Sequence, residues 1–222
     1  MQRSLQITSD GSHTIAVPEL NATYHSKYGA IQESEHIFIN TGLKPLLHKH
    51  STLSIFEMGM GTGLNVLLTL QQAIEQNQAI HYTTLELFPL LKEEYAALNY
   101  CTIQELQKLN KYFELIHNSQ WNAATFIHPL FRLVKMNQSL LHLNTASKFH
   151  LIYYDAFAPS AQPELWTKSI FQKLYSMLYE GGVLITYCSK GVVQRTMQSA
   201  GFTIEKHSGP KGKREIVKAI KL

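Results

Sequence analysis

From residue 53 to the C-terminus, short apolar runs alternate with stretches of helical periodicity, and this alternation limits the fold more than any other feature of the sequence. The apolar runs predict buried strands, and the stretches between them predict amphipathic helices. Strands that alternate with helices favour a mostly parallel sheet covered on both faces. We therefore expect an α/β fold with a seven-stranded sheet whose last two strands form an antiparallel hairpin. The strands are expected at residues 53–58, 80–87, 131–136, 149–155, 181–188, 202–207 and 214–222, and the helices at residues 64–76, 90–99, 102–120, 163–178 and 190–200.

The first 45 residues follow a different pattern. Two apolar runs, residues 5–8 and 13–17, flank an Asp-Gly turn signal, which predicts a small β-rich hairpin. Residues 21–43 mix aromatic and polar groups too irregularly for one element, and we expect them to form a lid or a substrate-facing surface. We therefore divide the chain into an N-terminal hairpin with a lid-like extension, residues 1–45, and a main domain, residues 46–222.

Composition excludes several other classes of protein. The N-terminus lacks the apolar stretch of a secretory signal, and no window approaches the roughly 20 apolar residues of a membrane span. We expect a cytoplasmic protein without membrane contact. The two isolated cysteines and eleven scattered histidines lack the spacing of metal ligands, so no metal is expected.

Glycines occupy every second position between the first main strand and the helix that follows it. Gly59, Gly61 and Gly63 permit positive φ angles and let a ligand approach the backbone closely. Their spacing differs from the G-x-G-x-x-G dinucleotide fingerprint, and the chain has no triphosphate-binding loop. The E-x-G-x-G-x-G run that begins at Glu57 resembles motif I of class I S-adenosylmethionine-dependent methyltransferases. A tight turn alone would also account for the glycines.

Acidic residues end two later strands. At the position of Glu86, a carboxylate can accept hydrogen bonds from both ribose hydroxyls of such a cofactor. Because the ligand crevice of an open α/β sheet lies at the carboxyl ends of its strands, Asp155 should face the same crevice. There it can orient an amine and stabilise the positive charge that develops during methyl transfer. A solvated strand-end acid and a turn-capping aspartate are the alternative interpretations.

Longer runs resemble one family, the methyltransferase half of MnmC, a bifunctional enzyme that modifies the tRNA wobble uridine. Residues 155–159, with Pro163, Trp166 and Thr167, resemble its D-G-F-A-P-x-x-N-P-x-M-W-T signature. Residues 59–65 resemble its G-F-G-T-G-L-N run, and residues 86–90 its E-K-F-P-L run. The matches follow in order from about residue 20 to the end of the chain.

This resemblance implies a Rossmann-like methyltransferase domain over residues 46–222, with S-adenosylmethionine as the methyl donor and S-adenosylhomocysteine as the product. The implied reaction methylates the amine of 5-aminomethyl-2-thiouridine at the tRNA wobble position, giving 5-methylaminomethyl-2-thiouridine, with Asp155 as the catalytic residue. The chain has no length for the family's flavin-dependent half, so we expect a stand-alone methyltransferase without FAD. A separate flavin oxidoreductase, or another wobble-uridine enzyme, is a candidate partner.

The implied cofactor site uses the glycine loop, the ends of the strands and the loops that follow them. An acid that often contacts adenine after the third strand is missing, and Asn137 is the candidate in its place. The expected cofactor-binding residues are Glu57, Gly59, Gly61, Thr62, Gly63, Asn65, Glu86, Leu87, Phe88, Asn137 and Asp155.

Basic residues concentrate at the C-terminus. From Lys206 onward the chain carries a local charge of +5, whereas the first 205 residues carry −1. Such a segment can neutralise phosphates near a tRNA anticodon stem-loop. The residues expected to contact RNA or substrate are the cations Lys190, Arg195, Lys211, Lys213 and Arg214, and the stiff, stacking loop of Phe157, Pro159 and Trp166. A solvated, lysine-rich sheet edge and a core role for the aromatic residues are the alternatives.

Two other functions fit parts of the same pattern. A small-molecule N-methyl or aminopropyl transferase of the polyamine type would share the fold and the glycine loop, but a small amine gains nothing from the basic tail. A catalytically silent RNA-binding module would use the tail, but it has no need for the glycine loop, Glu86 and Asp155.

Overall fold

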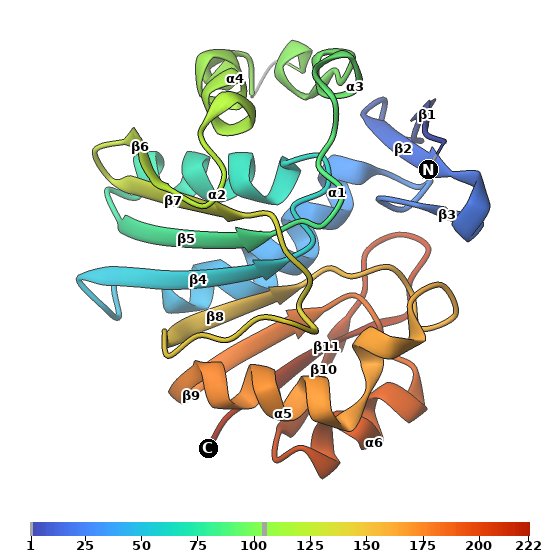
Figure 1. Cartoon of the computed structure of the whole chain (residues 1–222), viewed down its shortest axis with the longest axis vertical. Helices are drawn as coiled ribbons and strands as arrows, with labels where there is room; N and C mark the ends of the chain where they lie inside the picture. Colours follow the sequence, from blue (N-terminus) through green and yellow to red (C-terminus); the bar gives the residue numbers. More distant parts are fainter. Residues whose placement is uncertain (1, 104–105) are drawn as a thin grey trace.

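The computed structural model describes residues 2–103 and 106–222, and one eight-stranded sheet forms its centre (Figure 1). The strands follow the order β10-β11-β9-β8-β4-β5-β7-β6 across the sheet. They are β4 (Thr52–Met58), β5 (Ala79–Leu85), β6 (Ala124–His128), β7 (Phe131–Met136), β8 (Phe149–Tyr154), β9 (Leu178–Thr186), β10 (Thr203–Ser208) and β11 (Glu215–Ile220). The strands from β9 to β7 pair in parallel, and the pairs β9–β11, β11–β10 and β7–β6 are antiparallel. The α/β class and the C-terminal hairpin are confirmed.

Helices cover both faces of this sheet (Figure 1). Successive side chains on a strand point to opposite faces, so Ile55 packs in the core beneath α2 and Phe56 in the core beneath α5. This burial on both sides explains why the parallel strands are continuous apolar runs in the sequence. The helices are α2 (Leu64–Glu75), α3 (Lys92–Ala96) and α4 (Asn110–Asn118) on one side, and α5 (Lys168–Met177) and α6 (Gly191–Ser199) on the other; single 3₁₀ turns cover Pro18–Leu20, Lys44–Leu46, Tyr100–Thr102, Gln107–Leu109 and Pro163–Trp166.

The N-terminal segment begins with a three-stranded antiparallel sheet of β1 (Ser4–Ile7), β2 (His13–Val17) and β3 (Ala22–Thr23), which confirms the expected hairpin. It continues as α1 (Ala30–Ser34) and the π-helix η2 (Glu35–Leu43). The Phe38 ring of η2 packs 5.1 Å from the Tyr153 ring of β8. Residues 30–43, for which the sequence favoured no single element, therefore form helix and pack against the main sheet.

The sheet differs from the expected one in two places. It has one strand more than seven, because β6 joins the edge beside β7. Only Ile127 of the five residues of β6 is buried, and Phe126 is 68% exposed, so its sequence lacks the apolar pattern of a buried strand. In addition, β9 begins at Leu178 rather than after the Gly181-Gly182 pair. The glycines lie inside the strand at an irregularity in its pairing with β8, where Gly181 adopts a φ of +74°.

Three of the expected helices are shorter than their periodicity indicated. The stretch at residues 163–178 divides into the turn Pro163–Trp166 and helix α5, which Thr167 caps by accepting a hydrogen bond from the Ile170 backbone N–H. The stretch at residues 90–99 holds only the five residues of α3. Of the expected helix 102–120, only α4 (Asn110–Asn118) is α-helical, preceded by the 3₁₀ turn Gln107–Leu109, and residues 104 and 105 lie outside the described residues.

Candidate functional site

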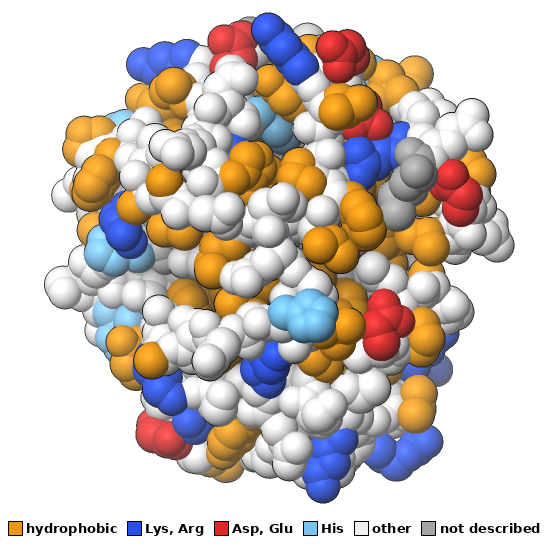
Figure 2. All heavy atoms as spheres, viewed as in Figure 1, with side chains coloured by type: hydrophobic (Ala, Val, Ile, Leu, Met, Phe, Trp, Pro, Cys, Tyr) orange, Lys and Arg blue, Asp and Glu red, His pale blue; other side chains and the backbone are white. Residues whose placement is uncertain are grey.

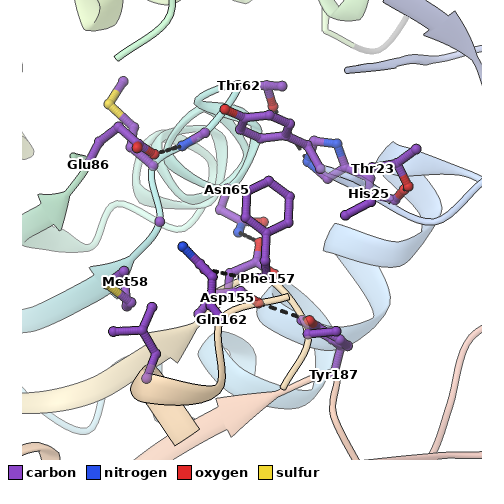
Figure 3. A pocket seen from close by; sticks show the side chains of 18 of the residues that line it. Thr23, His25, Met58, Thr62, Asn65, Glu86, Asp155, Phe157, Gln162 and Tyr187 are labelled. Carbon is purple, nitrogen blue, oxygen red and sulfur yellow. Dashed lines mark hydrogen bonds between the residues drawn. The ribbon is translucent and has the colours of Figure 1, made fainter. Parts of the chain in front are cut away.

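A cavity of about 590 Å³ opens at the carboxyl ends of β4, β5, β8 and β9, where open α/β sheets bind their ligands (Figure 3). Its volume lies within the range of roughly 300–1,000 Å³ that is usual for small-molecule sites. The sheet contributes the glycine loop, Glu86, Asp155 and Tyr187 to the wall. The N-terminal segment contributes residues 21–26 and Glu33, and the loop between β10 and β11 contributes Lys213. The cavity is therefore built from parts of the chain that are far apart in sequence.

The glycine loop requires glycine at two positions that line the cavity. Gly59 has a φ of +90°, and a Cβ there would lie 2.8 Å from the backbone oxygen of Asp155. Gly61 has a φ of +51°, and a Cβ there would lie 2.7 Å from the Tyr24 ring. A side chain at Gly59 would separate β4 from the Asp155 loop, and one at Gly61 would displace Tyr24. Gly63 is the N-cap of α2 and lies behind the cavity wall, against His117.

Glu86 ties the glycine loop to the loop that follows β5. Its Oε2 accepts a hydrogen bond from the Gly61 backbone N–H at 3.0 Å, and its Oε1 accepts one from the Phe88 N–H at 2.9 Å. Each carboxylate oxygen has two lone pairs, so each can accept one bond more. Leu87 and Phe88 line the cavity beside it and are about half exposed.

Asn137 supports this loop from outside the cavity. Its side-chain amide donates to the backbone oxygens of Glu86 at 2.8 Å and of Leu87 at 3.2 Å. Asn137 belongs to the loop that follows β7, and the residues of that loop that line the cavity are Ser139 and Leu141. Asn137, expected from the sequence to contact the cofactor, thus lies outside the cavity lining and contacts the loop that carries Glu86.

Asp155 faces the cavity directly after β8 (Figure 3). Its Oδ2 accepts a hydrogen bond from the side-chain amide of Asn65, at the start of α2, at 3.0 Å. The pKa of Asp155 is raised to about 7, chiefly by burial and also by the negative charge of Glu33, and this value already includes the opposing effects of Lys213 and the Asn65 amide. Asp155 therefore titrates near neutral pH, where both of its protonation states are populated.

Glu57 and Thr62 are both buried, but only Thr62 reaches the cavity. The Thr62 hydroxyl accepts a hydrogen bond from the Tyr100 hydroxyl at 3.0 Å. The Glu57 side chain lies below the cavity floor, where its Oε2 accepts a hydrogen bond from the Thr84 hydroxyl at 2.7 Å. Glu57 therefore does not occupy the place expected of a residue that contacts the cofactor.

The aromatic residues after β8 take two different roles. Phe157 lines the cavity, and its ring packs edge to face against the Tyr24 ring with the centroids 5.2 Å apart. Trp166 is 6% exposed and packs against Tyr154, and its indole N–H donates to the Phe157 backbone oxygen at 2.8 Å. Trp166 thus holds the loop from the core side. The stacking surface expected of Trp166 from the sequence is not present, and the alternative core role applies. Pro159 also lies outside the cavity lining.

Several wall residues were not identified from the sequence: Tyr24, His25, Glu33, Gln162 and Tyr187. Burial lowers the pKa of His25 to about 4, so its imidazole is neutral at physiological pH. Tyr187 donates its hydroxyl hydrogen to the Ala156 backbone oxygen at 2.9 Å. Tyr187 directly follows the carboxyl end of β9, so the rule that indicated Asp155 could also have indicated Tyr187.

Four basic side chains of the C-terminal segment face acids. Lys213 pairs with Glu33 in the cavity wall, and the other pairs are Lys206–Glu215, Lys218–Glu205 and Lys221–Glu180, at 3.2, 3.0 and 3.1 Å. Lys190, Arg195, Lys211 and Arg214 are exposed and lie outside the cavity. Figure 2 shows Lys and Arg side chains spaced apart over the lower part of one face, where α5 and α6 lie in Figure 1. The local charge excess of this segment is therefore partly compensated.

Within residues 2–103 and 106–222, no helix is long and apolar enough to cross a bilayer. Over the same described ranges, no group of three or more His, Cys, Asp or Glu side chains is arranged to hold a metal ion.

Known proteins resemble the chain in both sequence and fold. Residues 106–222 match the family described as S-adenosyl-L-methionine-dependent methyltransferase. The chain is 30% identical to the tRNA 5-methylaminomethyl-2-thiouridine biosynthesis bifunctional protein MnmC of Burkholderia mallei, over 96% of this chain and 35% of that protein. It is 27% identical to the protein of the same name from Pseudoalteromonas atlantica, over 97% of this chain and 33% of that protein. The chain thus spans about a third of the length of these relatives.

Solved structures share the fold at lower identity. MnmC2 of Aquifex aeolicus superposes with a TM-score of 0.78 at 22% identity, covering 99% of this chain and 70% of the other. Spermidine synthase of Thermotoga maritima superposes with a TM-score of 0.57 at 14% identity, covering 100% of this chain and 72% of the other. At these identities the similarity concerns the fold alone.

Proposed function

Because the chain belongs to the S-adenosyl-L-methionine-dependent methyltransferase family, we propose that it methylates the amine of 5-aminomethyl-2-thiouridine at the tRNA wobble position, giving 5-methylaminomethyl-2-thiouridine. One observation carries the proposal. The Asp155 carboxyl group faces the cavity between the glycine loop and the aromatic side chains of Phe157 and Tyr187. A carboxylate in that position suits a nucleophile that must be oriented and must lose a proton, as an amine does.

The residues at the cavity fit the cofactor that the family uses. Glu86 keeps an acceptor site on each oxygen for the ribose hydroxyls, and the exposed faces of Leu87 and Phe88 are suited to the adenine ring. Thr62 and Asn65 contribute polar groups from the start of α2. When bound, S-adenosylmethionine supplies an electrophilic methyl carbon on a positively charged sulfur.

Asp155 would act on the amine. An amine attacks only as the free base, and a carboxylate whose pKa lies near 7 can accept its hydrogen bond and then its proton at physiological pH. Asn65 holds Oδ2 of Asp155, which leaves Oδ1 to face the substrate. The negative charge of Asp155 also stabilises the positive charge that develops on the nitrogen as the new C–N bond forms.

The choice of tRNA rests on the relatives and on the exposed cations. The proteins from Burkholderia mallei and Pseudoalteromonas atlantica are named for the biosynthesis of 5-methylaminomethyl-2-thiouridine in tRNA. Lys211 and Arg214 lie on the same loop as Lys213, which lines the cavity. Their charges can therefore neutralise phosphates beside a nucleoside that enters the cavity.

The test is transfer of a labelled methyl group from S-adenosylmethionine to tRNA that carries the aminomethyl wobble uridine. We expect label in the nucleoside 5-methylaminomethyl-2-thiouridine, none on the same tRNA without the aminomethyl group, and none on putrescine or spermidine. Asp155→Asn should abolish transfer while leaving cofactor binding, measured by calorimetry, within about tenfold of the wild type. Label on polyamines would refute the proposed tRNA substrate. The absence of S-adenosylmethionine binding at millimolar concentration would refute the proposal that the chain catalyses methyl transfer.

A further inference from the structure

A buried row of polar side chains lies between the sheet and helix α2, directly behind Asp155. Glu57 projects from β4 between Thr84 of β5 and Tyr153 of β8, its partners in strand register. Asn65 and Thr69, one turn apart on α2, lie over the same face, with the Thr69 hydroxyl 3.3 Å from that of Tyr153 and the Asn65 amide bonded to Asp155. Glu57 is 0% exposed and Asn65 is 3% exposed, so this row is shielded from solvent.

Three atoms of the row make no hydrogen bond of standard geometry among the described residues: Glu57 Oε1, Asn65 Oδ1 and the Tyr82 hydroxyl. Leaving such groups unpaired in the interior is unfavourable, because they lose their hydrogen bonds to water without gaining others. An ionised Glu57 offers only acceptors, and Asn65 Oδ1 is an acceptor too, so the two oxygens cannot satisfy each other while Glu57 is charged. A proton on Glu57 Oε1 makes it the donor that Asn65 Oδ1 lacks.

We propose that Glu57 is held in its acid form and positions the catalytic carboxylate through Asn65. The Glu57 Oε1–H group donates to Asn65 Oδ1, and the amide then has its Nδ2 directed at Asp155 Oδ2, where the hydrogen bond of 3.0 Å is present. Glu57 is a positioning residue and touches neither substrate nor cofactor. This inference rests on the role proposed above for Asp155.

The electrostatic surroundings favour the acid form of Glu57. The pKa of Glu57 is raised to about 8, chiefly by burial and also by the negative charge of Asp155, and this value already includes the opposing effect of the Thr84, Asn65 and Tyr82 side chains, which can donate to the ionised carboxylate. The titratable groups that face Glu57 are Tyr82 of β5, Tyr153 of β8 and Asp155, and all three would be anionic when charged. Helix α2 adds only Asn65 and Thr69, which do not titrate.

The two carboxyl groups therefore divide their roles by environment. Asp155 faces the cavity and is stabilised as an anion by Lys213 and the Asn65 amide, whereas Glu57 has neither contact with the cavity nor a facing cation. Asp155 ionises first and Glu57 retains its proton. Without that proton, Glu57 becomes a second anionic acceptor that competes with Asp155 for the Asn65 N–H side, and the Asn65 carbonyl oxygen is left without a donor.

Two substitutions test the inference through methyl transfer. In Glu57→Gln, the new amide can accept from Thr84 through its oxygen and donate to Asn65 through its nitrogen, so kcat should stay within about threefold of the wild type. The wild type should lose activity as Glu57 ionises above about pH 8, and Glu57→Gln should lack this loss. Glu57→Leu provides no donor, so kcat should fall at least about tenfold while cofactor affinity stays unchanged. Equal losses in Glu57→Gln and Glu57→Leu would overturn the inference.

A second measurement does not require the substrate. Carboxyl carbon resonances of the free protein, followed with pH, report the titration of Asp155 directly. We expect Glu57→Gln to leave the Asp155 pKa in place and Glu57→Leu to raise it by on the order of one unit, because Asp155 loses a donor. In an Asn65→Ala background, in which the linking amide is removed, the two Glu57 variants should give the same Asp155 pKa.

An Asp155 titration that is indifferent to Glu57→Leu, or a Glu57 resonance that shows an ionised carboxylate at neutral pH, would refute the proposal. This titration does not require tRNA. Failure of methyl transfer in the wild type would therefore refute the proposed function alone. The carboxyl resonances would still decide whether Glu57 acts on Asp155 through Asn65.

Discussion

Lys213 Nζ forms an ion pair with the Glu33 carboxylate inside the cavity wall. Glu33 is 7% exposed, and its other oxygen accepts a hydrogen bond from the Ser26 backbone N–H at 2.7 Å. Lys213 also lies over the Tyr187 ring, 4.2 Å from its centroid. The pair joins helix α1 near the N-terminus to the loop between the last two strands, and it stands next to Asp155.

Lys213→Met should lower the free energy of unfolding by on the order of 2–3 kcal/mol, because it leaves the Glu33 carboxylate buried without a cation. Lys211→Met is the matched control, since Lys211 is exposed two residues away, and it should change stability by less than about 0.5 kcal/mol. Urea unfolding of both variants at neutral pH measures the difference. Equal stability of the two variants would mean that the ion pair contributes nothing.

Lys213→Met should also shift the pH dependence of methyl transfer. The charge of Lys213 lowers the pKa of Asp155, so its removal raises that pKa above its present value of about 7. Less of the carboxylate is then ionised at neutral pH, and the acid limb of the kcat/KM profile moves to higher pH. Activity at neutral pH should fall and recover partly in alkali. An acid limb that stays in place would separate Lys213 from the ionisation of Asp155.

Phe157→Ala should affect catalysis, whereas Trp166→Ala should affect stability. Phe157 lines the cavity, so its loss should reduce kcat/KM with little change in stability. Trp166 is 6% exposed in the core, and its truncation should cost about 3–5 kcal/mol of stability. Thermal unfolding and steady-state kinetics of both variants measure this. A stable Trp166→Ala protein with weakened tRNA binding would restore the stacking role expected from the sequence.

Lys211→Gln combined with Arg214→Gln should reduce the slope of log K against log salt for tRNA binding by about two. Both side chains are exposed, and neither takes part in the ion pairs of the C-terminal segment within the described residues. Lys218→Gln is the control, because Lys218 is paired with Glu205 at 3.0 Å. Fluorescence titrations at several salt concentrations provide the slopes. A slope unchanged by the double substitution would remove this loop from the RNA-binding surface.

The parallel body of the fold could be predicted because its signals are local. Each buried strand has its own apolar run, and the glycine loop, Glu86 and Asp155 each follow such a run directly. The rule that ligands bind at the carboxyl ends of strands then brings them together without knowledge of the packing. Strand β6 lacked this signal because its edge position leaves it exposed.

The rest of the site depends on contacts between distant segments. Counting charges placed Lys213 in a basic tail, but only the fold brings Glu33 against it. An aromatic residue between prolines and a helix suits a stacking surface and a core equally, so the sequence could not assign Trp166. Residues 21–43 were expected to face the substrate, but no local pattern singles out Tyr24 and His25, which enter the wall because β3 folds back over the glycine loop.

The order of the strands also has a consequence for how the chain folds. Strand β4 receives one neighbour, β5, from the next segment of the chain, but its other neighbour is β8, so that Ile55 pairs with Leu151. During synthesis β4, α2 and β5 leave the ribosome well before β8, and until β8 arrives one side of β4 offers unpaired backbone and an uncovered apolar surface. The glycine loop and Glu86 therefore emerge before β8 and Asp155, which directly follows it, and during this interval the exposed strand makes the nascent chain prone to aggregation.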